Sequence, residues 1–472
     1  MNLTPVHLIS LGCARNEVDS EELAGRLAAD GFELVTDPSQ ATVVVVNTCG
    51  FIDAAKKDSI DTLLAAAEMK GGTTRAVVAV GCLAERYGSE LAEALPEADA
   101  VLGFDDYPQV AAKLRAVLDG TRLSAHAPRD RRSLLPIAPA ARAAEAAGVV
   151  VPGHGDPAAG RPANGPRVLR QRLGSGPSAP LKIASGCDRR CAFCAIPSFR
   201  GSYLSRPSAE IVAEARWLVD SGVREVVLVS ENSTGYGRDV GTNLESLLAE
   251  LSVVEGLDWI RVSYLQPAEI NPALLHAMLT LPTVVPYFDL PFQHSSAELL
   301  RRMRRFGDAD SFLDLIGRIR AARPEAGIRA NVILGFPGET EAMVDDLADF
   351  LGTAQLDVVG VFGYSDEEGT EGARLRPKVD AEVIAERVDR IATVVEQVSA
   401  DRAAERIGDR VQVLVEEVTA DGAVVGRAAH QGPEVDGMVT ISTGGSQVSG
   451  GALGWSRVTD TDGVDLVVEW EG

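Results

Sequence analysis

Six cysteines carry the clearest chemical signal in the sequence, and three of them stand close together. Cys187, Cys191 and Cys194 have the spacing C-x-x-x-C-x-x-C. Soft thiolates at such a spacing bind zinc or an iron-sulfur cluster. Structural zinc normally has four ligands and paired C-x-x-C spacing. The three thiols therefore favour a four-iron cluster that leaves one iron open to a substrate, with a zinc site of incomplete ligation as the alternative.

The other three cysteines each follow a run of residues that we predict to be a strand. The runs are residues 6–11, 42–46 and 75–80, and the cysteines that follow them are, in the same order, Cys13, Cys49 and Cys82. Parallel strands end at one shared edge of a sheet, where such folds place their ligands. The sequence therefore predicts a second three-thiolate cluster, against the alternative that this placement is chance.

The elements that must position these thiols divide the chain into four parts. Residues 1–124 alternate strands and helices, which predicts a parallel α/β sheet domain. Residues 181–404 contain six more βα units, typical of a partial (β/α)6 barrel, and end in a long amphipathic helix. Residues 405–472 change to short strands with Gly and Asp turns, which predicts a small all-β barrel. Between the two α/β domains, 29 of the 56 residues 125–180 are Ala, Pro or Gly, so we expect a disordered insertion or linker there.

Charge and hydropathy exclude several partners. The chain has 45 Lys and Arg against 68 Asp and Glu, a net charge of −23, which repels phosphate backbones. A basic protein is therefore a better partner than nucleic acid. No apolar run approaches the ~20 residues of a membrane span, so no membrane partner is expected. The N-terminus lacks the basic region and apolar stretch of a secretory signal, which predicts a cytoplasmic protein.

The segment CDRRCAFC at residues 187–194, with Phe193 before the third cysteine, resembles the radical S-adenosylmethionine enzymes. The resemblance implies a partial βα barrel whose open cluster iron holds the amino and carboxylate groups of S-adenosylmethionine. It also implies that one electron from this cluster cleaves S-adenosylmethionine to a 5′-deoxyadenosyl radical. Phe193 would lie beside the adenine.

The whole arrangement, a three-cysteine domain, a radical S-adenosylmethionine core and a small β-barrel, resembles the methylthiotransferases. The resemblance implies two 4Fe-4S clusters, the second one held by Cys13, Cys49 and Cys82. It further implies that the last domain is a TRAM-like barrel that binds the substrate. An electron donor such as flavodoxin or ferredoxin is also implied.

Two types of this family differ in substrate. The segments GCARNEVDSE at residues 12–21 and NTCGFIDAAK at residues 47–56 resemble the RimO type, which modifies the β-carbon of an aspartate in the twelfth small-subunit ribosomal protein. The MiaB type, which modifies an adenosine of transfer RNA, is the alternative. Residues 405–472 carry 12 acids and 4 Arg, and an acidic barrel suits a basic ribosomal protein better than RNA. A non-catalytic metal-binding module is a further alternative.

Several weaker signals keep two interpretations each. The segment SENSTGYG at residues 230–237 departs from the Gln-Asp-Thr-Thr expected in the family, so no role in holding S-adenosylmethionine is assigned to Glu231. The loop at residues 335–340 either caps a helix or contacts S-adenosylmethionine. His294 is a ligand contact or a satisfied histidine, and the basic run at residues 301–305 contacts anions or forms a solvated face. We expect His154 to be solvated.

Overall fold

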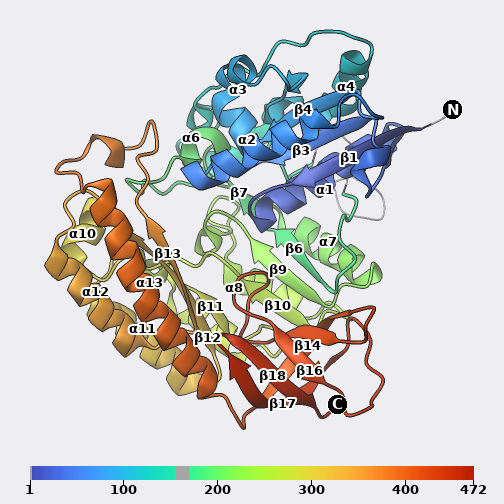
Figure 1. Cartoon of the computed structure of the whole chain (residues 1–472). Coiled ribbons are helices and arrows are strands. Elements are labelled where there is room, and N and C mark those ends of the chain that lie inside the picture. Colours follow the sequence, from blue (N-terminus) through green and yellow to red (C-terminus); the bar gives the residue numbers. More distant parts are fainter. Residues whose placement is uncertain (1–2, 156–169) are drawn as a thin grey trace.

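The computed structural model describes residues 3–155 and 170–472. Its first part contains β1 (Thr4–Ser10), α1 (Ala14–Ala29), β2 (Phe32–Leu34), β3 (Val43–Thr48), α2 (Asp53–Glu68), β4 (Ala76–Gly81), α3 (Cys82–Ala94), β5 (Ala100–Val101) and α4 (Val110–Leu118). The strands form a parallel sheet in the order β2-β1-β3-β4-β5 (Figure 1). β3 and β4 are buried along their whole length, because helices cover both faces of such apolar strands. The predicted parallel α/β domain is confirmed.

The central part is a partial βα barrel. Its strands are β6 (Ser178–Lys182), β9 (Glu225–Val229), β10 (Trp259–Val262), β11 (Tyr287–Asp289), β12 (Gly327–Leu334) and β13 (Val358–Gly363). Its main helices are α7 (Ser208–Asp220), α8 (Leu244–Leu251), α9 (Pro272–Thr280), α10 (Ala297–Arg302), α11 (Ala309–Ala322) and α12 (Glu341–Ala354). Two parallel sheets, β10-β9-β6 and β11-β12-β13, meet through a bridge between Ile260 and Val284. These six strands form the open barrel that the sequence predicted.

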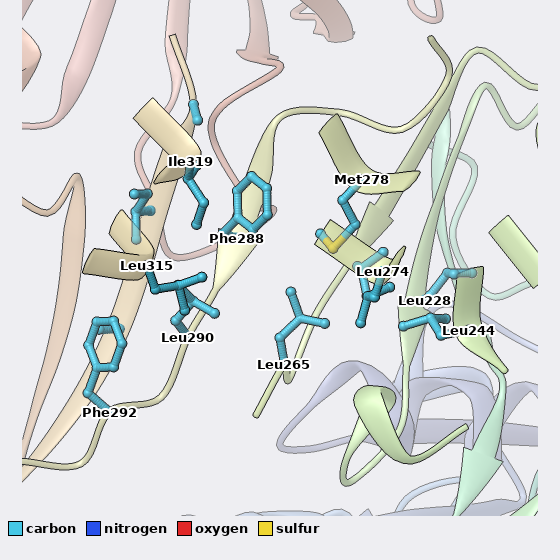
Figure 2. Packing of buried hydrophobic residues seen from close by; sticks show 14 of the residues in the cluster. Leu228, Leu244, Leu265, Leu274, Met278, Phe288, Leu290, Phe292, Leu315 and Ile319 are labelled. Atoms are coloured by element: carbon cyan, nitrogen blue, oxygen red, sulfur yellow. The ribbon is translucent and has the colours of Figure 1, made fainter. Parts of the chain in front are cut away.

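One apolar core lies between the barrel strands and the helices outside them. Figure 2 shows Leu228 of β9 with Leu244 of α8, and Phe288 of β11 with Ile319 of α11, within this cluster. Because the strand residues alternate, their other side chains face the barrel interior. The core therefore fixes the strand ends on which the thiols and their neighbours lie.

The last part of the chain is a closed all-β barrel, as predicted. It follows the long helix α13 (Ala381–Ala404) and contains β14 (Arg410–Val418), β15 (Val424–Ala428), β16 (Val439–Ser442), β17 (Leu453–Asp462) and β18 (Asp465–Trp470). The strand order is β14-β15-β16-β18-β17. In Figure 1 this barrel lies at the end of the molecule opposite the N-terminal sheet. Closure leaves no exposed sheet edge.

The closed barrel docks on the amino ends of the central strands. Glu225, the first residue of β9, accepts a hydrogen bond from Arg261 at 2.7 Å and pairs with Arg427 of the closed barrel. A Cβ added to Gly327, the first residue of β12, would lie 2.0 Å from the His430 carbonyl oxygen. The cysteines follow the opposite ends of strands, so the closed barrel lies away from them.

The segment predicted as disordered is packed in the parts that the structure describes. Arg131, Arg142 and Arg170 are buried there. Arg131 donates to Glu85 at 3.1 Å, and Arg170 pairs with both Glu21 and Glu214. The prediction of disorder is wrong for residues 125–155 and 170–180, because buried Arg–carboxylate pairs replace the apolar core that the composition lacks. The remainder, residues 156–169, lies outside the described residues.

Among the helices that the structure describes, none has the length and apolar character needed to cross a membrane.

Candidate active site

The loops that carry the first three cysteines meet at the carboxyl edge of the N-terminal sheet. Cys13 caps α1, Cys49 follows β3, and Cys82 is the first residue of α3. A Cβ added to Gly12 would lie 2.9 Å from the Cys49 Sγ, and one added to Gly50 would lie 2.9 Å from the Leu83 nitrogen. Only glycine fits this close approach at Gly12, whose φ is +91°.

A buried guanidinium from the central domain reaches this first group of thiols. Arg200 Nη2 donates to the Cys82 Sγ at 3.0 Å and to the Asn16 Oδ1 at 2.7 Å. Arg200 Nη1 donates to the Asp19 Oδ2 at 2.7 Å. The cysteine edge of the N-terminal sheet is therefore closed by a residue from another domain.

Burial and the neighbouring cations act in opposite directions on these thiols. At Cys82, burial raises the pKa to about 12, although the Arg200 charge opposes the shift. At Cys13, burial acts to raise the pKa, but the charge and hydrogen bond of Arg15 outweigh it, so the net shift is downward. Burial raises the pKa of Cys49. A metal ion binds the thiolate, so ligation removes the proton of each thiol. The positive charges of Arg15 and Arg200 favour the same thiolate form.

The second group of cysteines lies on one loop of the central domain. This loop runs from β7 (Ala184–Ser185) to α6 (Ile196–Arg200). The Arg189 backbone N–H donates to the Cys187 Sγ at 3.4 Å, and Arg305 Nη1 lies 3.9 Å from the Cys191 Sγ. Burial, and then the charge of Cys191, raise the pKa of Cys194 to about 12, whereas Arg15 and Arg305 act to lower it. Burial also raises the pKa of Cys187.

Two arginines connect the two groups of cysteines. Arg200 is the last residue of α6, directly after the second cysteine loop, and bonds to Cys82 of the first group. Arg15 Nε donates to the Cys13 Sγ at 3.4 Å, and Arg15 Nη1 donates to the Ser230 carbonyl oxygen at 3.2 Å, after β9. In Figure 1, α6 lies beside α3 of the N-terminal domain. The two groups therefore border one seam between the two domains.

The donor set fits iron-sulfur clusters. All six cysteines are free thiols, and thiolate is the usual ligand of such clusters. Among residues 3–155 and 170–472, no three His, Cys, Asp or Glu side chains stand at the separation that a single metal ion requires. In a four-iron cluster each thiolate binds a different iron. The sulfur ligands of such a cluster therefore stand further apart than those of one zinc ion, which all bind the same metal at ~2.3 Å.

Three side chains near the seam have unusual environments that sequence analysis missed or left unassigned. The Glu231 side chain is 2 % exposed, and its Oε2 has no hydrogen-bond partner in the described part of the chain. Tyr264 and Gln293 follow β10 and β11 and have φ values of 60° and 74°. Strained backbone of this kind clusters at functional sites. Residue propensities in the sequence do not indicate the strained backbone of Tyr264 and Gln293. The position of the charged Glu231 directly after a predicted strand, in contrast, can be read from the sequence.

The weaker candidates have mostly local roles. The Thr340 Oγ1 caps α12 by accepting from the Met343 nitrogen, which agrees with the helix-cap interpretation of that loop. The His294 Nδ1 accepts from the backbone nitrogens of Ser295 and Ser296, and its Nε2 lies 3.6 Å from Glu339.

Of the remaining candidates, the basic run at residues 301–305 divides. Arg304 pairs with Glu371, whereas Arg305 is buried beside Cys191. Phe193 is partly buried against the central core. The backbone N–H of His154 donates to the Val151 carbonyl oxygen at 3.1 Å, so His154 belongs to the packed part of the inserted segment.

Three family models match separate parts of the chain. Residues 5–103 match the uncharacterized protein family UPF0004, residues 181–351 match the radical SAM superfamily, and residues 407–470 match the TRAM domain. Among solved structures, a radical S-adenosylmethionine methyltransferase, TsrM, from Kitasatospora setae is similar over 76% of this chain and 75% of its own, with a TM-score of 0.51 at 15% identity. This likeness shows the fold.

Curated relatives match over nearly the full length. A protein of Cutibacterium acnes is 63% identical over 99% of this chain and 98% of its own length, and one of Kineococcus radiotolerans is 59% identical over 98% and 96%. A protein of Streptomyces coelicolor is 56% identical over 98% and 96%. All three are named ribosomal protein uS12 methylthiotransferase RimO.

Proposed function

We infer that the chain, which belongs to the RimO family of ribosomal protein uS12 methylthiotransferases, adds a methylthio group to the β-carbon of an aspartate in uS12. It is a transferase of the radical S-adenosylmethionine type. The family names favour this substrate over transfer RNA, the alternative that the sequence left open. The acidic closed barrel also suits a basic ribosomal protein.

The cofactors are S-adenosylmethionine and iron-sulfur clusters. Cys187, Cys191 and Cys194 would hold the 4Fe-4S cluster that the radical SAM family implies. We propose that a second 4Fe-4S cluster is held by the other group of cysteines, Cys13, Cys49 and Cys82. When bound, the clusters supply the electron that cleaves S-adenosylmethionine and an open iron that carries the sulfur to be transferred.

The residues of this chain have distinct tasks around those groups. Arg200 and Arg15 offset the negative charge of two thiolates of the first group, Cys82 and Cys13. The unpartnered Oε2 of Glu231 suits the ammonium group of S-adenosylmethionine, since a buried carboxylate oxygen needs a donor. Phe193 would lie beside the adenine, as the resemblance implies.

One observation carries the proposal: Arg200 follows the second cysteine loop directly and bonds to Cys82 of the first group. The two groups are far apart in sequence, and this contact brings their loops to a common seam. Sulfur delivery and radical formation must reach one substrate carbon, so both sites must open to one chamber.

Further parts of the assignment follow from the substrate. Because uS12 belongs to the ribosome, we propose a cytoplasmic enzyme, reduced by a donor such as flavodoxin or ferredoxin. We also propose that the chain is organised as residues 1–124, 125–180, 181–404 and 405–472, with the cluster-binding domain first and the TRAM-like barrel last.

Two cysteine variants test the two-cluster assignment. Cys191→Ala should abolish formation of 5′-deoxyadenosine, because it removes a ligand of the radical-forming cluster. Cys49→Ala should abolish methylthio transfer while reductive cleavage of S-adenosylmethionine continues. Both products are measured by mass spectrometry after anaerobic turnover. Normal sulfur transfer by Cys49→Ala would remove the second cluster from the account.

Iron content gives an independent measurement. Anaerobic reconstitution should give about eight irons per chain for two four-iron clusters, and about four for either cysteine variant. If the iron content of the wild type reached only about four per chain, the protein would hold one cluster and not two.

The substrate is tested in cells that lack this chain. The mass of uS12 should decrease by one methylthio group replacing hydrogen, and the modified nucleosides of transfer RNA should not change. An unchanged uS12 with altered transfer RNA would replace the proposed substrate by the alternative one.

A further inference from the structure

One arginine of the N-terminal domain extends out of that domain to the carboxyl ends of the central strands. Arg15 lies in the first turn of α1, two residues after Cys13. Its Nε donates to the Cys13 Sγ at 3.4 Å, and its Nη1 donates to the Ser230 carbonyl oxygen at 3.2 Å. Its guanidinium therefore lies on the seam between the two groups of cysteines.

An aromatic ring packs against this guanidinium. The Arg15 Cζ lies 4.7 Å from the centre of the Tyr264 ring, a cation–π contact. Tyr264 has a φ of 60°, and its backbone N–H donates to the Asp289 Oδ2 at 2.8 Å. A bulky residue adopts this conformation only when the surrounding structure imposes it. The fold therefore holds a strained residue in the position that orients Arg15.

Arg15 keeps hydrogen-bonding capacity that its surroundings do not use. The side chain is 13 % exposed, and among the described residues its Nη2 has no hydrogen-bond partner. The nearest carboxylate, Glu231, lies 3.9 Å from Nε, beyond hydrogen-bond distance. A planar guanidinium with free donors at a partly open site is suited to bind a carboxylate.

Two neighbouring arginines, Arg200 and Arg305, direct their donors to the protein itself. Arg200 donates hydrogen bonds to Asp19, Asn16 and Cys82. Arg305 donates to the Pro291 carbonyl oxygen and is buried. Unlike Arg200 and Arg305, whose described contacts are to protein groups only, Arg15 thus has a donor available to a ligand at this seam.

We propose that Arg15 binds the side-chain carboxylate of the substrate aspartate and so selects an acidic residue for modification. This inference rests on the proposed function and names the group that recognises its substrate. The carboxylate of aspartate is attached directly to the β-carbon. A cation that holds the carboxylate between the two cysteine groups therefore also fixes the C–H bond that must react there.

The test compares two substrates with two enzymes in a binding experiment. The substrates are purified uS12 and the form in which the modified aspartate is replaced by asparagine, each labelled with a fluorophore. The enzymes are full-length wild type and Arg15→Met, both reconstituted anaerobically. S-adenosylmethionine is present and reductant is absent, so no turnover occurs. The dissociation constants follow from fluorescence anisotropy.

Wild type should bind the aspartate form about 10- to 100-fold more tightly than the asparagine form, because a charge-assisted hydrogen bond is lost with the latter. For Arg15→Met this ratio should fall to about one. Equal ratios in the two enzymes would overturn the proposal. If Arg15→Met weakens the binding of both substrates by the same factor, Arg15 has a structural role only, and the proposal is also wrong.

Two further variants guard against trivial results. Arg15→Lys keeps the positive charge but lacks the two parallel N–H donors of a guanidinium, so it should fold and retain a smaller preference for the aspartate form. The absence of any preference in this variant would contradict the proposal. Arg318→Met removes an exposed arginine of α11 and should keep the wild-type ratio.

Failure of the proposed function is recognised separately, because reduced wild-type enzyme would then leave the mass of uS12 unchanged. A wild type that modifies uS12 but binds both forms equally would contradict this inference alone.

Discussion

At the scale of single residues, the guanidinium of Arg200 joins two domains. It contacts a carboxylate, an amide oxygen and a thiol of the N-terminal domain, and its side chain is only 3 % exposed. The partners Asp19 and Asn16 both lie on α1. A buried charge of this kind contributes stability only while every partner is in place.

Replacing Arg200 by Met should therefore weaken both the fold and the first cysteine site. Asp19 keeps Lys182 as a partner, so we expect a loss of about 1–3 kcal/mol in the free energy of unfolding, measured in urea. Iron content should fall from about eight towards four per chain, because Cys82 loses its cation. The exposed control Arg318→Met should change neither quantity. Full iron content in Arg200→Met would contradict this role.

The cysteines were predictable from sequence, whereas their partners were not. Thiols are rare, and their spacing or their place after a strand is visible directly. Arg200 bonds to Cys82 across 118 residues, and nothing in the local sequence distinguishes it from the many other arginines. The left-handed backbone of Tyr264 also depends on tertiary contacts, here the carboxylate of Asp289, which local propensity does not contain.

At the scale of elements, the closed barrel is attached to the central barrel by buried charges. Glu225 at the start of β9 lies between Arg261 and Arg427 and is fully buried. Arg261 also donates to the Ala429 carbonyl oxygen at 2.9 Å. Because removal of one partner leaves the others buried without compensation, this contact should be sensitive to substitution.

Glu225→Gln should lower the free energy of unfolding by roughly 3 kcal/mol, since two buried arginines lose their shared carboxylate. Limited proteolysis should then release a C-terminal fragment faster than in wild type. Glu325→Gln, which removes an exposed carboxylate paired with Arg323, is the matched control and should stay within about 0.5 kcal/mol of wild type. Equal effects of both variants would show that burial does not matter here.

The same carboxylate predicts a pH dependence. Although burial opposes it, the charges of Arg427 and Arg261 lower the pKa of Glu225 to about 2, below the ~4.3 of an unfolded chain. Its stabilisation is therefore complete above about pH 5 and is lost as the pH falls towards 2. The difference in unfolding free energy between wild type and Glu225→Gln should be constant from pH 7 to 5 and shrink below. A difference that grows in acid would contradict the assignment.

Elements with regular alternation were predicted well, and the inserted segment was not. Its Ala, Pro and Gly content cannot build an apolar core, which is why the composition indicated disorder. In its described parts, Arg142 donates to the Tyr203 carbonyl oxygen and Arg170 pairs with Glu21 and Glu214. Those acids belong to helices of two other domains, so the contacts cannot be inferred from the segment alone.

At the scale of the whole molecule, charges from three parts of the chain act on Glu17 near the start of α1. The electrostatic neighbours of Glu17 are Glu21 on the same helix, Arg170 and Arg172 of the inserted segment, and Glu434 of the last domain. Burial, and then the charge of Glu21, raise the pKa of Glu17 to about 7. The stability of the fold should thus depend on the protonation of Glu17 near neutral pH.

Glu17→Gln tests this coupling. The pKa of Glu17 is higher in the folded than in the unfolded chain, so folded protein binds more protons between about pH 4.3 and 7. Its contribution to stability is therefore complete in acid and is lost as the pH rises through 7. The free energy of unfolding of Glu17→Gln minus that of wild type should increase from pH 5 to pH 8. A difference that does not change with pH would contradict the raised pKa.

The acids buried on α1 have a consequence for synthesis of the protein. Asp19 and Glu21 pair with Lys182 and Arg170. A nascent chain emerges from its N-terminus, so these carboxylates leave the translating ribosome more than a hundred residues before their partners. We therefore expect these carboxylates of α1 to stay hydrated until the later segments arrive.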